Sequence, residues 1–438
     1  MNDPDTLVVT ARTFLDAAMP MFKERCDGSA DQALAFPGRS RWVRDESVGG
    51  LMGRFRTVPW GFSRSQQCAL RVLNELSEEE FGSLGELERA LSDDGVVGPR
   101  VAAGSVVSAG AGGGVWQARS LILVLVERLA ELSETFELPD SERGTLVESW
   151  VGGLRREFDE ITVVTALREF ECSVTPLELE PGCDLVVLAD EEIEVALTFG
   201  GGIAGLSLDE RSVAQTFAIR TGFRSSLHVD EIPPKEMSGD VARGQDAERL
   251  AGRVVLALRL FKAGLVSASG VFRYSCSPSG MRPSRGSIGP GFVWHAAQPY
   301  VLAEDEIDPF REFWAAFRKS DDDALIRSVV RRFGYAASRN LADDKIVDLM
   351  IAAESLFLSG VGDEKQRGEL GYRLSMRAAA LLGSDIDERL RIRRFMSRAY
   401  GIRSTIVHGG TPKPKDVRNL EPLRVSCRLF GLSLGLLA

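Results

Sequence analysis

A histidine and an arginine near the C-terminal end are the residues of this sequence best suited to catalysis. The chain has only three histidines, His228, His295 and His408, so few side chains titrate near neutral pH. His408 stands in the stretch YGIRSTIVHGG, five residues after Arg403. Histidine can move a proton, and a guanidinium can clamp phosphate oxygens as negative charge develops. The pair therefore fits attack of a ribose 2′-hydroxyl on the adjacent phosphodiester, which requires no metal.

The spacing of this pair leaves two interpretations open. Five residues of ideal helix place Arg403 and His408 about 140° apart around the axis, so they share a face only if the last turn unwinds or a second protomer supplies the missing partner. Gly409 and Gly410 follow directly and make unwinding inexpensive. The alternative is structural: a histidine that caps the helix C-terminus and an exposed arginine in its last turn, where cations are favoured. The spacing alone favours this structural interpretation.

Glu354 is the second unusual residue. In DDKIVDLMIAAESLFLS it falls at the same amphipathic spacing as four apolar residues, Val347, Met350, Ile351 and Leu358. A carboxylate within an apolar stripe needs a cationic partner, because an unpaired buried charge is costly. Arg403 or Arg377 on a neighbouring helix would serve. The pair would either orient a catalytic arginine or be a structural ion pair.

Three stretches resemble one protein family. RFGYAASRNLADDKIVDLMIAAESLFLS, GELGYRLSMRAAALLG and AYGIRSTIVHGG are similar to the ApeA-like branch of the HEPN superfamily, over about Asp321 to Ala438. In that superfamily an R-x4–6-H motif marks metal-independent ribonucleases. The resemblance implies that Arg403 and His408 are the catalytic pair and that Glu354 is the acidic residue of the preceding core helix. It also implies a homodimer whose two motifs form one RNA cleft, in a toxin, stress or phage-defence setting.

Ser404 departs from the pattern of the family. The residue after the motif arginine is often Asn, Asp or His in the superfamily's ribonucleases; serine can still hydrogen-bond a phosphate or a ribose and would support the pair. Gly410 occupies the position where antitoxin-modified HEPN toxins carry tyrosine, so no nucleotidyltransferase partner is implied. The departure at Ser404 keeps a second function open, a non-catalytic RNA- or nucleotide-binding sensor with a HEPN dimerisation bundle. A purely structural interaction protein is a third.

The residues that would position this site are predicted to be helical. Apolar spacing and glycine-containing loops predict an all-α bundle in 319–438, with helices over Leu325–Arg339, Ala342–Ser359, Gln366–Leu382, Asp385–Val407 and Lys415–Leu437. The acidic run Asp321 to Asp323 is expected to cap the first of them.

The rest of the chain is predicted to be an α+β N-terminal region in two parts. Residues 1–171 are expected to be mostly helical, with a mobile glycine-rich loop over 95–114 and helices over Leu7–Arg25, Gln66–Leu76, Gln117–Phe136 and Leu146–Phe170. Residues 172–318 are expected to form an α+β domain of unknown role. Its predicted elements are a helix over Arg253–Lys262 and strands over Gly270–Ser277 and Phe292–Gln298.

Composition limits the remaining classes. With 438 residues, 44% hydrophobic and 26% charged, the chain is expected to form two or three ordinary globular domains. The sequence has no apolar run of the about 18 residues that a membrane span needs, so no span is predicted. The N-terminus lacks the basic start of a signal peptide, and a cytoplasmic protein is therefore expected. The six cysteines form no CxxC pair and are expected to be reduced. No metal or cofactor is expected.

Charge is unevenly distributed along the chain. The net charge is −10, but residues 321–438 hold 20 basic and 15 acidic residues, which leaves a net of −15 for residues 1–320. The cationic part suits RNA. The asymmetry suggests the hypothesis that the acidic region shields an RNA cleft until it meets an unknown trigger ligand.

Overall fold

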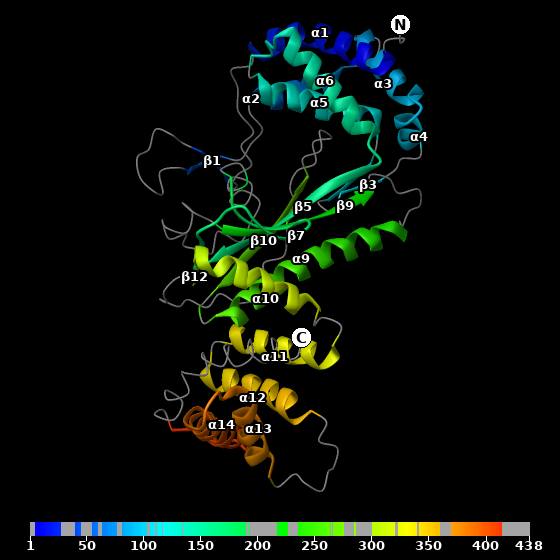
Figure 1. Cartoon of the computed structure of the whole chain (residues 1–438). Coiled ribbons are helices and arrows are strands. Elements are labelled where there is room, and N and C mark those ends of the chain that lie inside the picture. Colours follow the sequence, from blue (N-terminus) through cyan, green and yellow to red (C-terminus); the bar gives the residue numbers. More distant parts are fainter. Residues whose placement is uncertain are drawn as a thin grey trace. The chain divides into compact units, whose positions relative to one another are not determined.

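The computed structural model (Figure 1) is described here for the following residues: 5–27, 40–44, 55–59, 64–76, 81–102, 106–109, 112–115, 117–133, 135–189, 192, 217–226, 235–262, 264, 266–275, 284–285, 300–319, 323–339, 341–359 and 369–413. Contacts group the chain into two compact units. One comprises Met1–Thr165, Val187–Arg249 and Gly270–Ile288, and the other Ala166–Val186, Leu250–Ser269 and Gly289–Ala438. The units interleave along the sequence, and the boundaries predicted at 171/172 and 318/319 stay predictions.

The N-terminal part is largely helical. Its helices are α1 Thr6–Asp27, α2 Arg64–Glu75, α3 Gly82–Asp93, α4 Val97–Ala102, α5 Ala118–Leu132 and α6 Asp140–Arg155. Apolar residues at spacings of three and four give each longer helix one buried stripe. These stripes meet in one core that includes the fully buried Phe14, Phe22 and Trp150. The helices predicted from 7, 66 and 117 are confirmed to within a few residues at their starts.

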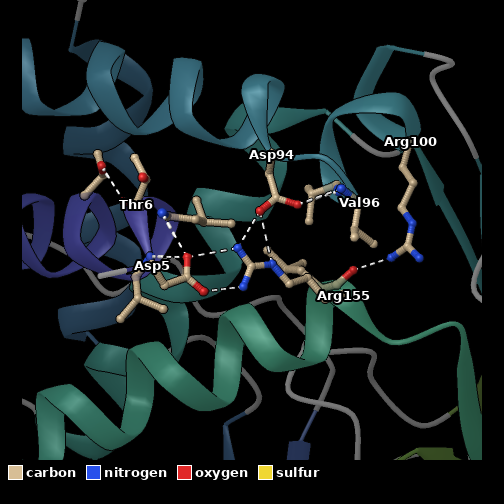
Figure 2. A network of polar contacts seen from close by, with 11 residues as sticks. Asp5, Thr6, Asp94, Val96, Arg100 and Arg155 are labelled. Atoms are coloured by element: carbon tan, nitrogen blue, oxygen red, sulfur yellow. Dashed lines mark hydrogen bonds and ion pairs between the residues drawn. The ribbon is translucent and has the colours of Figure 1, made fainter. Parts of the chain in front are cut away.

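Arg155, at the C-terminal end of α6, links the beginnings of two other helices (Figure 2). Its guanidinium donates to Asp94 from Nε at 3.1 Å and to Asp5 from Nη2 at 2.9 Å. Asp94 also accepts two backbone N–H groups at the start of α4, both at 2.9 Å. Asp5 accepts two at the start of α1, at 3.1 and 3.4 Å. The two carboxylates thus cap helix N-termini while one guanidinium pairs with both.

Among the described residues, the strands form one six-stranded sheet and three smaller pairs. The sheet has the order β11-β10-β5-β9-β8-β7, built from β5 Phe158–Arg168, β7 Leu177–Glu180, β8 Cys183–Val187, β9 Phe217–Ser226, β10 Ser267–Ser275 and β11 Ser284–Arg285. β7 and β8 pair antiparallel, with Leu177 opposite Leu185. The smaller pairs are antiparallel β1 Ser40–Arg44 with β2 Phe55–Pro59, antiparallel β3 Val106–Ala109 with β4 Gly112–Val115, and parallel β6 Phe170–Cys172 with β12 Tyr300–Leu302.

Three predictions for the first 171 residues are wrong. The helix predicted over Leu146–Phe170 ends at Arg155, and β5 follows from Phe158. Its run of β-branched residues, ITVVT, suits a pleated, half-buried strand better than a helix. Strands therefore begin well before residue 172. The predicted loop over 95–114 contains helix α4 and parts of the hairpin β3–β4.

The prediction of reduced cysteines is also wrong in part. Cys68 is disulfide-bonded, whereas Cys172 and Cys183 are free and buried. Burial raises the pKa of the Cys183 thiol to about 12, with the carboxylates of Glu180 and Asp184 adding to the effect. That thiol therefore stays protonated across the physiological range.

The C-terminal part is mostly helical, so the chain is mixed in class, with a sheet and helices followed by a helical region (Figure 1). Its helices are α9 Lys235–Phe261, the short 3-10 turn η2 Glu304–Glu306, α10 Ile307–Lys319, α11 Ala324–Ser338, α12 Ala342–Leu358, α13 Leu370–Leu382 and α14 Ile386–Val407. Asp323 caps α11 by accepting backbone N–H groups at 2.7 and 3.1 Å, as predicted. The predicted helix over 415–437 and strand over 292–298 lie outside the described residues.

We predict that Arg155→Met destabilises the N-terminal part by about 1–3 kcal/mol, because the Asp94 side chain, only 7% exposed, loses two charge-assisted donors. Arg155 holds the pKa of both Asp5 and Asp94 below the usual 3.8. A carboxyl with a lowered folded-state pKa contributes stability above its unfolded value and loses it as the pH falls below about 4. The difference between variant and wild type should therefore shrink below about pH 4.

Urea unfolding followed by tryptophan fluorescence measures this difference. Arg249→Met is the matched control, because Arg249 makes exposed contacts, a pair with Asp246 in which both side chains are 68% exposed and a 3.4 Å bond to Gln245, and such pairs contribute little. Equal losses in the two variants, or a loss that is the same at pH 3 and pH 7, would contradict the role assigned to Arg155.

Candidate functional site

Helix α12 lies at the centre of the C-terminal bundle. It packs against α11, α13 and α14, and α13 packs along α14 (Figure 1). Its buried apolar residues are Ile346, Met350, Ala352, Ala353 and Phe357. The apolar stripe predicted for this helix is thus shifted: Met350 is buried, but Val347, Ile351 and Leu358 are half-buried. Glu354 lies at the edge of the buried face, not in its middle.

The ion pair expected for Glu354 is present. Arg403 Nη2 on α14 lies 3.5 Å from Glu354 Oε2 on α12, and the two side chains are 24% and 25% exposed. Arg377, the other partner considered, donates to the carbonyl oxygen of Phe357 at 2.9 Å. The geometry therefore selects Arg403 as the cation beside Glu354.

The contact between Glu354 and Arg403 leaves hydrogen-bonding capacity unused on both sides. Among the described residues, Glu354 Oε1 and Arg403 Nε are buried and have no hydrogen-bond partner. Burial raises the pKa of Glu354, and the charge of Arg403 opposes this only in part. A guanidinium has five N–H donors in a planar fork. Among the described residues the guanidinium of Arg403 is held only through Nη2, and its partly exposed end keeps N–H groups for an anion.

His408 caps the C-terminal end of α14. Gly409 has a left-handed φ of 77°, its N–H donates to the Ile406 carbonyl at 3.0 Å, and the N–H of Gly410 donates to the Thr405 carbonyl at 2.8 Å. These two bonds form a Schellman motif, in which glycine tolerates a φ that other residues avoid. The two glycines therefore end the helix sharply and leave its last turn regular.

This ending decides how Arg403 and His408 lie relative to one another. The helix continues to Val407, so their separation of about 140° around the axis remains. Arg403 points to Glu354, whereas His408 is exposed. One chain therefore does not bring the pair to one face. Ser404 is half-buried beside Arg403, and its carbonyl accepts the N–H of His408 at 3.1 Å.

Within the described part of the chain, two carboxylates are buried where the sequence pattern gave little or no indication of it. Asp348 on α12 is 3% exposed and accepts from Arg332 at 3.1 Å and from Arg339 at 2.9 Å. Its sequence signal was its place between Ile346 and Met350, on the face now seen to be buried. Acidic residues in helices usually face water, so this signal is weak.

The second buried carboxylate, Glu192, is 8% exposed. It accepts from Arg220 at 2.8 Å, from the Tyr274 hydroxyl at 2.6 Å and from the backbone N–H of Ala189 at 3.0 Å. No local pattern marked it, because its partners come from distant strands. Its hydrogen bonds fit a structural role, joining β9 and β10 through one side chain.

The described residues do not cover every candidate. His228 and His295 lie outside them. No helix in the described part of the chain is long and apolar enough to cross a membrane. Comparison with family models, with curated proteins and with solved structures finds no match to this chain.

We predict that Glu354→Gln is at least as stable as the wild type at pH 7. Because the folded-state pKa of Glu354 is raised, ionising this carboxyl disfavours folding at every pH above that pKa. This destabilisation of the wild type decreases as the pH falls through the raised pKa. It is absent below about pH 4, where Glu354 is protonated and is as neutral as the glutamine of the variant. Denaturant unfolding at several pH values measures the difference. Glu388→Gln is the control, since hydrogen bonds from Ser384 lower the pKa of Glu388 and its loss should act in the opposite direction.

Proposed function

We propose that this protein is a metal-independent endoribonuclease of the HEPN type, which cleaves RNA at a site shared by two copies of the chain. The observation that carries the proposal is the arrangement around α14. Arg403 is oriented by Glu354 and retains free donors, and the exposed His408 lies one turn further along. The resemblance of residues 321–438 to ApeA-like HEPN domains supports it, as does the net charge of +5 over those residues. A role in phage defence or stress follows from the resemblance alone.

In the proposed reaction the ribose 2′-oxygen attacks the adjacent phosphorus while the bond from phosphorus to the 5′-oxygen breaks. The products are a 2′,3′-cyclic phosphate and a 5′-hydroxyl. His408 takes the proton of the 2′-hydroxyl or gives one to the leaving oxygen. The guanidinium of Arg403 stabilises the charge on the non-bridging oxygens. Ser404 hydrogen-bonds the phosphate or ribose, and Glu354 holds Arg403 in place.

A second copy of the chain is needed because of the helix geometry. The two side chains diverge by about 140° on a regular α14. A two-fold axis beside α14 would place Arg403 of one protomer opposite His408 of its partner. Each dimer would then hold two composite sites in one cleft.

We predict that purified full-length protein cleaves RNA in EDTA, and that Arg403→Gln and His408→Ala each lower the rate by at least about a hundredfold. The products should carry 2′,3′-cyclic phosphate ends. Arg393→Gln is the matched control, because it removes an arginine from the same helix whose side chain stacks on Tyr372 instead of reaching Glu354. Absence of cleavage across several RNA pools would favour the non-catalytic sensor.

Mixing the two inactive variants tests whether the site is shared. If Arg403 and His408 act across the dimer, half of the dimers in an equal mixture are mixed and each holds one intact site. About a quarter of the wild-type activity should then return. If both residues act within one chain, the mixture stays inactive. Circular dichroism of each variant ensures that lost activity does not reflect unfolding.

A further inference from the structure

The exposed face of α14 carries a row of arginines that the proposed reaction does not use. Arg391, Arg394 and Arg398 are exposed and lie within about 60° of one another around the helix axis. Gly401, Thr405 and His408 continue the same exposed face toward the helix C-terminus. The row of arginines therefore leads to the proposed catalytic histidine.

Most of the charge on this face is not neutralised. Arg391 pairs with Glu388 at 3.2 Å. Within the part of the chain that the structure describes, Arg394 and Arg398 contact no carboxylate. The nearest acid on the face, Asp387, lies at the beginning of the helix, away from His408. The C-terminal two thirds of the face is thus cationic, and exposed guanidinium groups of this kind bind phosphate oxygens through paired N–H donors.

Gly401 is a second and independent observation. A glycine inside a helix is unfavourable compared with other residues, so it needs a reason. A Cβ added at Gly401 would meet nothing within 4 Å, so packing among the described residues does not require glycine there. Glycine also lets another molecule approach the helix backbone closely. Gly401 lies between Arg398 and His408 on the exposed face, where a bound strand would pass.

We propose that Arg394, Arg398 and Gly401 form a track for the phosphate backbone of single-stranded RNA, which guides the strand along α14 to His408. The two arginines are about 6 Å apart along the axis, and His408 lies about 15 Å beyond Arg398, so they contact phosphates several nucleotides away from the cleaved bond. A single row of cations on one helix matches one strand. That the bound polyanion is RNA rests on the proposed function. The cationic face and the open space at Gly401 are observed independently of that function.

Binding is measured by fluorescence anisotropy of a labelled single-stranded oligoribonucleotide, with full-length protein in the His408→Ala background, so that cleavage cannot interfere. Arg394→Gln with Arg398→Gln should weaken binding about tenfold or more at low salt. The logarithm of the association constant falls linearly with the logarithm of the salt concentration. The steepness of this line should decrease by about 1.4, since each lost phosphate contact on a single strand removes about 0.7. Arg224→Gln with Arg249→Gln is the matched control: it removes the same charge from exposed arginines elsewhere and should leave affinity and slope near their original values.

Gly401 variants test the path of the strand. Gly401→Ala and Gly401→Gln should both raise the melting temperature, because the site is open and glycine is a poor helix former. Gly401→Gln should nevertheless lower cleavage or binding several-fold, and Gly401→Ala should do so less. A fall in melting temperature would mean that Gly401 serves packing, and it would overturn this part of the proposal.

The outcomes separate this proposal from the proposed function. Weaker binding by the arginine variant, with no cleavage by the wild type, supports the track and rejects the ribonuclease. Cleavage by the wild type with unchanged binding by the arginine variant rejects the track and leaves the ribonuclease standing. The last experiment is competition with polyglutamate of matched charge. If polyglutamate displaces the labelled RNA as effectively as unlabelled RNA does, the face binds acidic proteins, and the proposal is overturned.

Discussion

A carboxylate removed from water needs a cation beside it, and helix α12 carries two carboxylates into the packing of the C-terminal bundle. Asp348 is held by Arg332 and Arg339 from the α11 side, and Glu354 by Arg403 on α14. Apolar side chains alone could hold the helices together, and a buried ion pair is weak evidence for stability. What the pairs add is direction, because a guanidinium beside a carboxylate is restricted in how it can turn. The orientation of Arg403 therefore depends on the charge that α12 buries.

The end of α14 is the second constraint on the site. The Schellman bonds of Gly409 and Gly410 keep the last turn helical up to Val407. A regular last turn exposes His408 on the outer face while Arg403 stays against α12. The two functions considered for this pair, capping and catalysis, are thus compatible: His408 caps the helix with its backbone, and its imidazole remains available. Within one chain, however, Arg403 and His408 do not share a face of α14.

Carboxylates are also paired with a cation in the N-terminal part, where the pairing links helices to one another. Arg155 bridges Asp5 and Asp94 while both carboxylates cap helices. Each nitrogen of its guanidinium donates to at least one of these two carboxylates, in contrast with Arg403, whose buried Nε has no partner among the described residues. Arg394 and Arg398 are at the opposite extreme, exposed and without a carboxylate in the described chain. The degree to which an arginine is satisfied internally distinguishes the structural cations from those that suit a phosphate ligand.

The sequence by itself determined the features that depend on neighbouring residues. The periodicity of apolar residues set the bundle helices from 324 to 407, Asp323 capped the first of them, and the two glycines ended the last. It also showed that Glu354 would need a cation. These follow from local rules, since capping, helix periodicity and the left-handed φ of glycine act within a few residues.

Tertiary structure decided the rest. Residues 158–168 carry apolar side chains that fit a strand or the continuation of a helix, and pairing in the sheet made them β5. Packing also chose Arg403 over Arg377 as the partner of Glu354. It buried Glu192, which no local pattern marked, and Asp348, for which the local signal was weak. The physical reason is that a charge selects its partner by distance in space, and residues 49 positions apart, as Glu354 and Arg403 are, come within reach only once the helices have packed.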